Sequence, residues 1–181
     1  MRAEHDAPYW CEENAWHLCA DARLASHRVD VIVVSNPARQ VALFHQRAAP
    51  HPAAPVVWDY HVLLGSRDDQ GRTWIWDLDT RLEFPADARA WLHATVRALP
   101  GVPAARFRAV PASQYRAHFG SDRSHMRGRD GAWLQPPPPW PPIGASHRLD
   151  ALLAFDDDAF GPWLDDADAL QRWLARDDDT G

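Results

Sequence analysis

The stretch 56-VVWDYHVLLGSRDDQGRTWIWDL-78 decides the fold. Its two apolar, strand-like runs, Val56–Leu64 and Thr73–Leu78, flank a polar loop, and this pattern is typical of a long β-hairpin. If the turn centres on Asp69, the register places His61 opposite Asp77 on the same face of the sheet. Because a charge within an apolar strand is costly unless it is paired, we expect these two side chains to contact each other.

Strand-like and helical patterns continue on both sides of the hairpin. We expect helices over Cys11–Ala25, Phe84–Leu99 and Asp165–Arg176, and strands over Val29–Val34, Gln40–His45 and Phe107–Val110. No internal repeat or long linker interrupts the 181 residues. The sequence therefore predicts one α+β domain over residues 1–181, with an N-terminal helix on a mostly antiparallel sheet and further flanking helices. Residues 177–181 are expected to be a frayed acidic tail.

Composition and charge exclude several classes of function. The formal net charge is −6, which repels phosphate backbones and argues against nucleic acid as a partner. No run of about 18 apolar residues could span a membrane, and the N-terminus lacks the apolar core of a secretory signal, so we expect a cytoplasmic protein. All 19 basic residues are Arg, which excludes a Schiff-base lysine and a Walker-type phosphate loop.

The chain has two cysteines, Cys11 and Cys19, on one predicted helix. Their separation of eight residues corresponds to about 12 Å along the helix, which is too far for a disulfide. No CxxC pair exists, so a Cys-rich zinc site is also excluded, and no metal is expected.

Cys11 is a candidate nucleophile because it stands at the predicted start of the first helix. Unsatisfied backbone N–H groups and the helix dipole favour an anion there, which lowers a thiol pKa and promotes the nucleophilic thiolate. Pro8 ahead of it and acidic residues after it fit a helix start. The alternative is a small core residue on an apolar face, and this is our interpretation of Cys19, which has no polar neighbour at a useful spacing.

A thiolate nucleophile needs a base and a group that orients the base. His61 is the candidate base and Asp77 the candidate orienter, conditional on the hairpin register. Asp79 shares the face of Asp77 and competes for that role. The alternative for His61 is a hydrogen-bonded structural histidine.

Five motifs now follow one another along the chain. They are 11-CEENAWHLC-19, 58-WDYHV-62, 77-DLDT-80, 121-SDRSHM-126 and 136-PPPP-139. This set resembles the protein N-terminal glutamine amidohydrolase family of the N-degron pathway, from about residue 9 to residue 143. The resemblance implies a papain-like or transglutaminase-like fold. It also implies a nucleophile at Cys11, a base at His61 and an orienting acid at Asp77.

The implied reaction deamidates the side chain of an N-terminal glutamine to glutamate through a Cys thioester and releases ammonia. Its partners would be proteins or peptides with a free N-terminal Gln, the enzyme would be a monomer, and no cofactor is implied. An acid must accept the substrate α-ammonium, and Glu13, Asp59 and Asp122 are the candidates, with Tyr60 as a further substrate-binding residue.

Several alternatives remain open. A transglutaminase-like acyltransferase or a cysteine peptidase would share the triad, and a module that binds N-terminal residues without catalysis would not need it. The loop Ser121–Met126 either lines the substrate cleft or is held by an Arg–Asp network. The segment Pro136–Pro142 is either a rigid strap that packs through Trp140 or a ligand for an SH3-type domain.

Overall fold

The computed structural model describes residues 6–144 and 146–177, and within them one antiparallel sheet has the strand order β6-β5-β4-β1-β7-β8. The strands are β1 (Arg28–Ser35), β4 (His61–Arg67), β5 (Thr73–Trp76), β6 (Ala86–Asp87), β7 (Arg106–Pro111) and β8 (Trp163–Leu164). A separate pair consists of β2 (Val41–Leu43) and β3 (Val56–Trp58). The expected α+β class with a mostly antiparallel sheet is confirmed.

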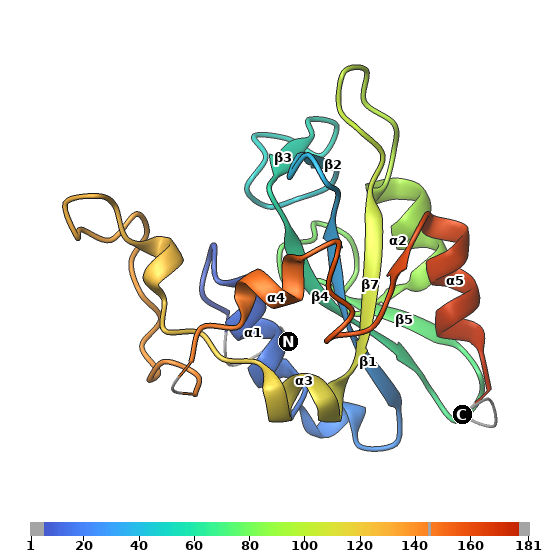
Figure 1. Cartoon of the computed structure of the whole chain (residues 1–181). Helices are drawn as coiled ribbons and strands as arrows, with labels where there is room; N and C mark the ends of the chain where they lie inside the picture. The colour runs from blue at the N-terminus through green and yellow to red at the C-terminus, as the bar shows by residue number, and fades with distance from the viewer. Residues whose placement is uncertain (1–5, 145, 178–181) are drawn as a thin grey trace.

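Helices cover both faces of this sheet. Figure 1 shows α1 (Cys11–Leu18), α3 (Ala112–His118) and α4 (Leu149–Leu153) on one side, and α2 (Ala88–Thr95) and α5 (Ala167–Ala175) on the other. The central strand β1 is therefore covered on both faces, and Val31–Val34 are fully buried. Alternate residues of this run belong to two cores: Val31 and Val33 pack toward α1, whereas Ile32 and Val34 pack toward α2 and α5.

The first helix begins at Cys11, as predicted, but it is shorter than expected. The Asn14 side chain accepts from the Ala7 backbone N–H and donates to the Ala7 carbonyl, which fixes the chain just ahead of the helix. At the other end the helix stops at Leu18, and Asp21 caps a separate 3₁₀ turn by accepting from the backbone N–H of Arg23. The predicted extension to Ala25 is wrong because the Asp21 side chain competes with continued helical hydrogen bonding.

The hairpin exists, but its register differs from the prediction by two residues. Leu64 pairs with Trp76, so the turn centres on Gln70 rather than Asp69. A shift of two residues keeps every side chain on its face, and β5 ends at Trp76, so Asp77 leaves the ladder and still reaches His61. The predicted strand Val56–Leu64 is divided into β3 and β4, which belong to different sheets.

The remaining differences involve short elements. The second predicted helix begins at Ala88, where Asp87 caps it, and the short strand β6 comes first. The helices α3 and α4 and the strand β8 were not predicted. No helix among the described residues is long and apolar enough to cross a membrane. Of the predicted acidic tail, Asp177 pairs with Arg67, and residues 178–181 lie outside the described part of the chain.

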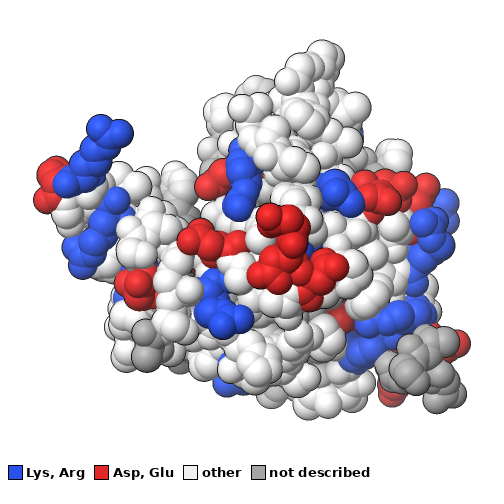
Figure 2. All heavy atoms as spheres, in the orientation of Figure 1, with Lys and Arg blue, Asp and Glu red and all other residues white. Residues whose placement is uncertain are grey.

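Acidic side chains gather on the face shown in Figure 2, over α4 and the segment that follows it. That segment contains Asp156, Asp157 and Asp158, and all three are exposed.

Candidate active site

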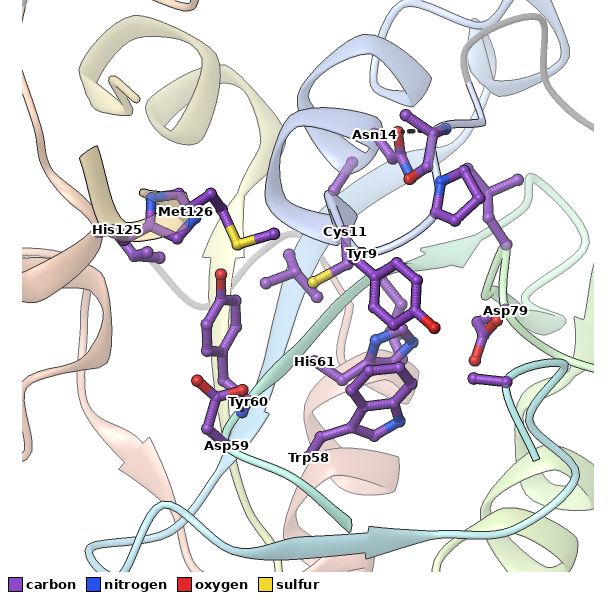
Figure 3. Close-up of a pocket in the computed structure, with 18 of the residues that line it drawn as sticks. Tyr9, Cys11, Asn14, Trp58, Asp59, Tyr60, His61, Asp79, His125 and Met126 are labelled. Atoms are coloured by element: carbon purple, nitrogen blue, oxygen red, sulfur yellow. Dashed lines mark hydrogen bonds between the residues drawn. The ribbon is translucent and has the colours of Figure 1, made fainter. Parts of the chain in front are cut away.

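The first residue of α1 and the first residue of β4 meet at one cavity. Cys11 and His61 both line this cavity, whose volume is about 590 Å³, within the range of small-molecule sites. Figure 3 shows Cys11 in the middle, with His125 and Met126 on one side of it and His61 and Asp79 on the other. Two predicted site residues that lie fifty residues apart in the sequence are therefore brought together by the packing of α1 against β4.

The imidazole of His61 is held by Asp77. Its Nε2 atom lies 2.8 Å from Asp77 Oδ1, and both side chains are almost completely buried. Burial opposes the charged form of the ring, but the Asp77 carboxylate outweighs it and raises the pKa of His61. Burial likewise opposes the Asp77 carboxylate, but His61 and the hydrogen bonds around it lower its pKa. The pair is thus an ionised carboxylate next to a basic imidazole.

Asp77 also accepts hydrogen bonds that the sequence did not reveal. Its Oδ2 accepts from Gln46 Nε2 at 3.0 Å and from Trp91 Nε1 at 3.2 Å, and its Oδ1 accepts from the backbone N–H of Asp79 at 2.9 Å. Gln46 is fully buried, which is unusual for a glutamine, and the sequence pattern gave no signal of its role. This network fixes the carboxylate, and the stacked ring of Trp58, 5.8 Å from the ring of His61, covers the imidazole.

Asp79 competed with Asp77 for the orienting role, and the geometry separates the two. Only the Asp77 carboxylate is hydrogen-bonded to His61, whereas Asp79 lines the cavity.

The resting thiol is not ionised in the way that its helix-start position predicts. Burial raises the pKa of Cys11 well above its usual value, and the neighbouring Glu12 carboxylate raises it further. The thiol donates to Glu12 Oε2 at 3.6 Å, and the Tyr60 hydroxyl donates to the same oxygen at 3.3 Å. The predicted lowering of the thiol pKa is therefore wrong for the unliganded site. Glu12, a fully buried acid beside the sulfur, was not singled out from the sequence.

The four residues predicted to bind substrate divide into two groups. Asp59 and Tyr60 line the cavity with Cys11. Glu13 is fully buried and receives a bidentate pair from Arg123, at 2.8 and 2.7 Å, and a hydrogen bond from Trp140. Asp122 is half-exposed, caps the turn at Ser124 and lies 3.1 Å from His147 Nδ1. Neither Glu13 nor Asp122 is part of the cavity wall, so the structure does not favour either as the ammonium acceptor.

The loop Ser121–Met126 both borders the cavity and is held by an arginine, but the partner of that arginine is Glu13 rather than the expected Asp. His125 and Met126 line the cavity, while Arg123 ties the loop to α1 through Glu13. The proline-rich segment is a strap: Trp10 Nε1 donates to the carbonyl of Pro136 at 2.9 Å, and Trp140 donates to Glu13 at 2.8 Å. Packing through Trp140 is thereby confirmed.

Comparisons with known proteins identify the family of the chain. The model of the family described as N-terminal glutamine amidase matches residues 6–173. A protein N-terminal glutamine amidohydrolase of Drosophila ananassae is 37% identical over 153 residues, which cover 81% of this chain and 75% of that protein. The protein of the same name from Arabidopsis thaliana is 35% identical over 168 residues, covering 84% and 76%. The chain belongs to the N-terminal glutamine amidase family.

Proposed function

We propose that this chain is a cysteine-dependent amidohydrolase that converts the N-terminal glutamine of proteins and peptides to glutamate and releases ammonia. One observation carries the proposal: His61, which is paired with the buried Asp77, lines the same cavity as the Cys11 thiol at the start of a helix. The names of the relatives give the substrate. A nucleophile on a helix, with its base and orienter on or beside adjacent strands, supports the papain-like or transglutaminase-like assignment of the fold.

The two ring nitrogens of His61 have different tasks. Because Nε2 is engaged by Asp77, Nδ1 is left to exchange a proton with the Cys11 thiol. The sulfur attacks the amide carbon of the Gln side chain as its proton passes to His61. The imidazolium then protonates the amide nitrogen, the C–N bond breaks, and ammonia leaves a thioester on Cys11. Water, deprotonated by His61, hydrolyses the thioester to the carboxylate of glutamate and restores the thiol.

Because the pKa of Cys11 is raised, the thiol keeps its proton before the substrate binds, and the proton passes to His61 during the reaction. The raised pKa of His61 makes the imidazole a competent acceptor, and Asp77 stabilises the imidazolium that results. The developing oxyanion would meet the backbone N–H of Cys11, since the first N–H groups of a helix have no partner within the helix.

The location and the oligomeric state of the enzyme belong to the same proposal. Both cysteines are free thiols, and thiols are kept reduced in the cytosol, which supports a cytoplasmic location. One chain carries Cys11, His61 and Asp77, so the proposed site needs no residue from a second subunit, which supports a monomeric enzyme.

An assay of ammonia release from four matched peptides tests the function. A peptide with a free N-terminal Gln should react, whereas peptides with N-acetyl-Gln or internal Gln should not. The rate with N-terminal Asn should be at least about 10- to 200-fold lower than with Gln, which is the discrimination that one methylene provides. The difference should be larger still, because an Asn peptide anchored by its ammonium holds its amide carbon out of position relative to Cys11. Equal rates on internal and terminal Gln would refute the proposal in favour of a transglutaminase-like enzyme.

The two cysteines provide a matched pair of variants for this assay. Cys11→Ala should abolish ammonia release without unfolding the protein. Cys19→Ala should retain most of the activity, because burial raises the pKa of Cys19 to about 12 and it lies outside the cavity wall. Binding of Gln peptides without turnover by the unmutated protein would instead identify a non-catalytic binding module.

A further inference from the structure

One acid in the cavity wall lacks a partner for part of its carboxylate. The Oδ2 atom of Asp79 is buried and has no hydrogen-bond partner among the residues that the structure describes. Burial raises the pKa of this carboxyl, and His61, the backbone N–H of Ala48 and Arg47 offset that rise only in part. Such an atom is costly unless a donor reaches it, and the Asp79 carboxyl borders the cavity, from which a donor on a ligand can approach.

Asp79 lies next to the catalytic base. Asp77 Oδ1 accepts both from His61 Nε2, at 2.8 Å, and from the backbone N–H of Asp79, at 2.9 Å. One carboxylate oxygen therefore fixes the position of the imidazole relative to the Asp79 backbone. In a glutamine the α-nitrogen is separated from the side-chain amide carbon by four bonds, or about 5 Å when extended. A substrate whose amide is at Cys11 and His61 can thus place its ammonium at the neighbouring wall.

Two aromatic rings border the same part of the cavity. The rings of Tyr9 and Trp58 make an edge contact with centroids 6.3 Å apart, and both residues line the cavity with Asp79. Figure 3 shows the Tyr9 hydroxyl directed toward the side on which Asp79 lies, and Trp58 beside His61. Aromatic faces attract cations through the ring quadrupole, and a carboxylate beside them supplies the countercharge.

We propose that Asp79, together with the rings of Tyr9 and Trp58, binds the α-ammonium group of the substrate and so determines specificity for a free N-terminus. This inference rests on the proposed function and deepens it, because it names the group that distinguishes the end of a chain from its interior.

The other acids near the cavity fit this role less well. Asp59 is exposed, and its Oδ1 already accepts from the Tyr60 backbone N–H, so an ion pair there is weakened by water. Asp6 is paired with Arg47 at 2.8 Å. Glu12 is fully buried outside the cavity wall: its Oε2 accepts from Cys11 and Tyr60, and its Oε1 lies 3.3 Å from His125 Nε2.

Three charged groups act on Asp79. They are His61, Asp77 and Arg47, and Arg47 is already bound to Asp6 and to the carbonyl of Leu78.

Calorimetric titration of Cys11→Ala protein tests the proposal without turnover. The ligands are a peptide with a free N-terminal Gln and its N-acetylated counterpart. The free peptide should bind about 10- to 150-fold more tightly, corresponding to a charged hydrogen bond of about 1.5–3 kcal/mol. Adding Asp79→Asn should abolish this difference, whereas Asp150→Asn, at an exposed acid of the same cavity, should preserve it.

Tyr9→Leu provides a second variant, because the Tyr9 side chain is 50% exposed and its loss should not unfold the protein. It should reduce the preference for the free peptide about two- to fivefold, as expected for an exposed cation–π contact. A preference that survives Asp79→Asn, or is lost in Asp59→Asn instead, would overturn the assignment.

Two outcomes separate this inference from the proposed function. Selective binding of the free N-terminus with no ammonia release by the unmutated protein would refute the function and leave the ammonium site standing. If Asp79→Asn shifts the pH profile of kcat but keeps the binding preference, Asp79 acts through His61 and the ammonium site is wrong.

Discussion

At the scale of single residues, the His61–Asp77 pair makes the sharpest prediction. Asp77→Asn should lower kcat by about 10³- to 10⁴-fold, because it removes the charge that stabilises the imidazolium and disturbs the tautomer. His61→Ala should remove essentially all turnover. The measurement is steady-state ammonia release by proteins that thermal melting shows to be folded, and an Asp77→Asn variant with nearly full kcat would contradict the orienting role.

The Asp77→Asn substitution should also change the pH dependence of kcat. Asp77 raises the pKa of His61, and neutral His61 is needed to accept the thiol proton, so the acid limb of the kcat profile should move to lower pH in Asp77→Asn. The stability that the pair contributes is present above the unfolded pKa of Asp77 and below that of His61. It is lost as pH falls through the lowered pKa of Asp77 or rises through the raised pKa of His61.

Residue identities allowed the triad to be predicted, but not what surrounds each group. Glu12 and Glu13 are adjacent and chemically identical, yet one contacts the thiol and the other is sealed by Arg123. The two glutamates differ because their side chains leave α1 in different directions and because Glu13 has a partner, Arg123, that is 110 residues away in the sequence. The thiol pKa failed as a prediction for the same reason, because local helix position was outweighed by burial and by Glu12.

At the scale of elements, Asp68 organises the β4–β5 turn. It accepts from the backbone N–H groups of Gln70 and Arg72, from Arg72 Nε and from Trp74 Nε1. These donors outweigh desolvation and lower the pKa of Asp68 to about 2. This turn explains why the register centres on Gln70, a detail that the hydrophobic pattern alone leaves open by two residues.

Asp68→Asn should therefore lower the Tm by a few degrees at neutral pH, since it leaves the turn with a weaker acceptor. Because the folded pKa lies below the unfolded value near 3.8, the contribution is present above about pH 4 and is lost as pH falls toward 2. The Tm difference between the variant and the unmutated protein should shrink over this range. A difference that stays constant from pH 7 to pH 2 would show that the Asp68 charge does not hold the turn.

Long periodic runs predicted elements well, and short ones did not. The strand β1 and the helix α5 lie within or close to their predicted ranges. The strand is a continuous apolar run of several residues, and the helix is amphipathic over at least two turns. The helices α3 and α4 have seven and five residues, and such helices depend on tertiary contacts. Tyr115 of α3 donates to the carbonyl of Glu12, and Arg108 donates to carbonyls of α4, contacts that no local pattern contains.

At the scale of the whole molecule, the long segment between α3 and α4 returns to the N-terminal helix. Figure 1 shows this segment running past α1 on the side away from α2 and α5. The Glu13–Arg123 pair, with side chains that are 0% and 6% exposed, connects α1 to the loop, and Trp140 joins both through its indole N–H and its carbonyl. His125 and Met126, which line the cavity, are therefore held in place by a buried ion pair that does not itself face the cavity.

Removing one partner of this pair should be costly, because the other charge is left buried. Arg123→Met should destabilise the protein by about 3–5 kcal/mol, or roughly 6–20 °C in Tm. Arg89→Met, at an exposed position of α2, is the matched control and should change stability by less than about 0.5 kcal/mol. The double variant Glu13→Gln/Arg123→Met should lose less than the sum of the two single losses, because no unpaired charge remains. Additive losses, measured by denaturant unfolding, would mean that the strap and the loop are held mainly by the packing of Trp10 and Trp140 and that the ion pair is incidental.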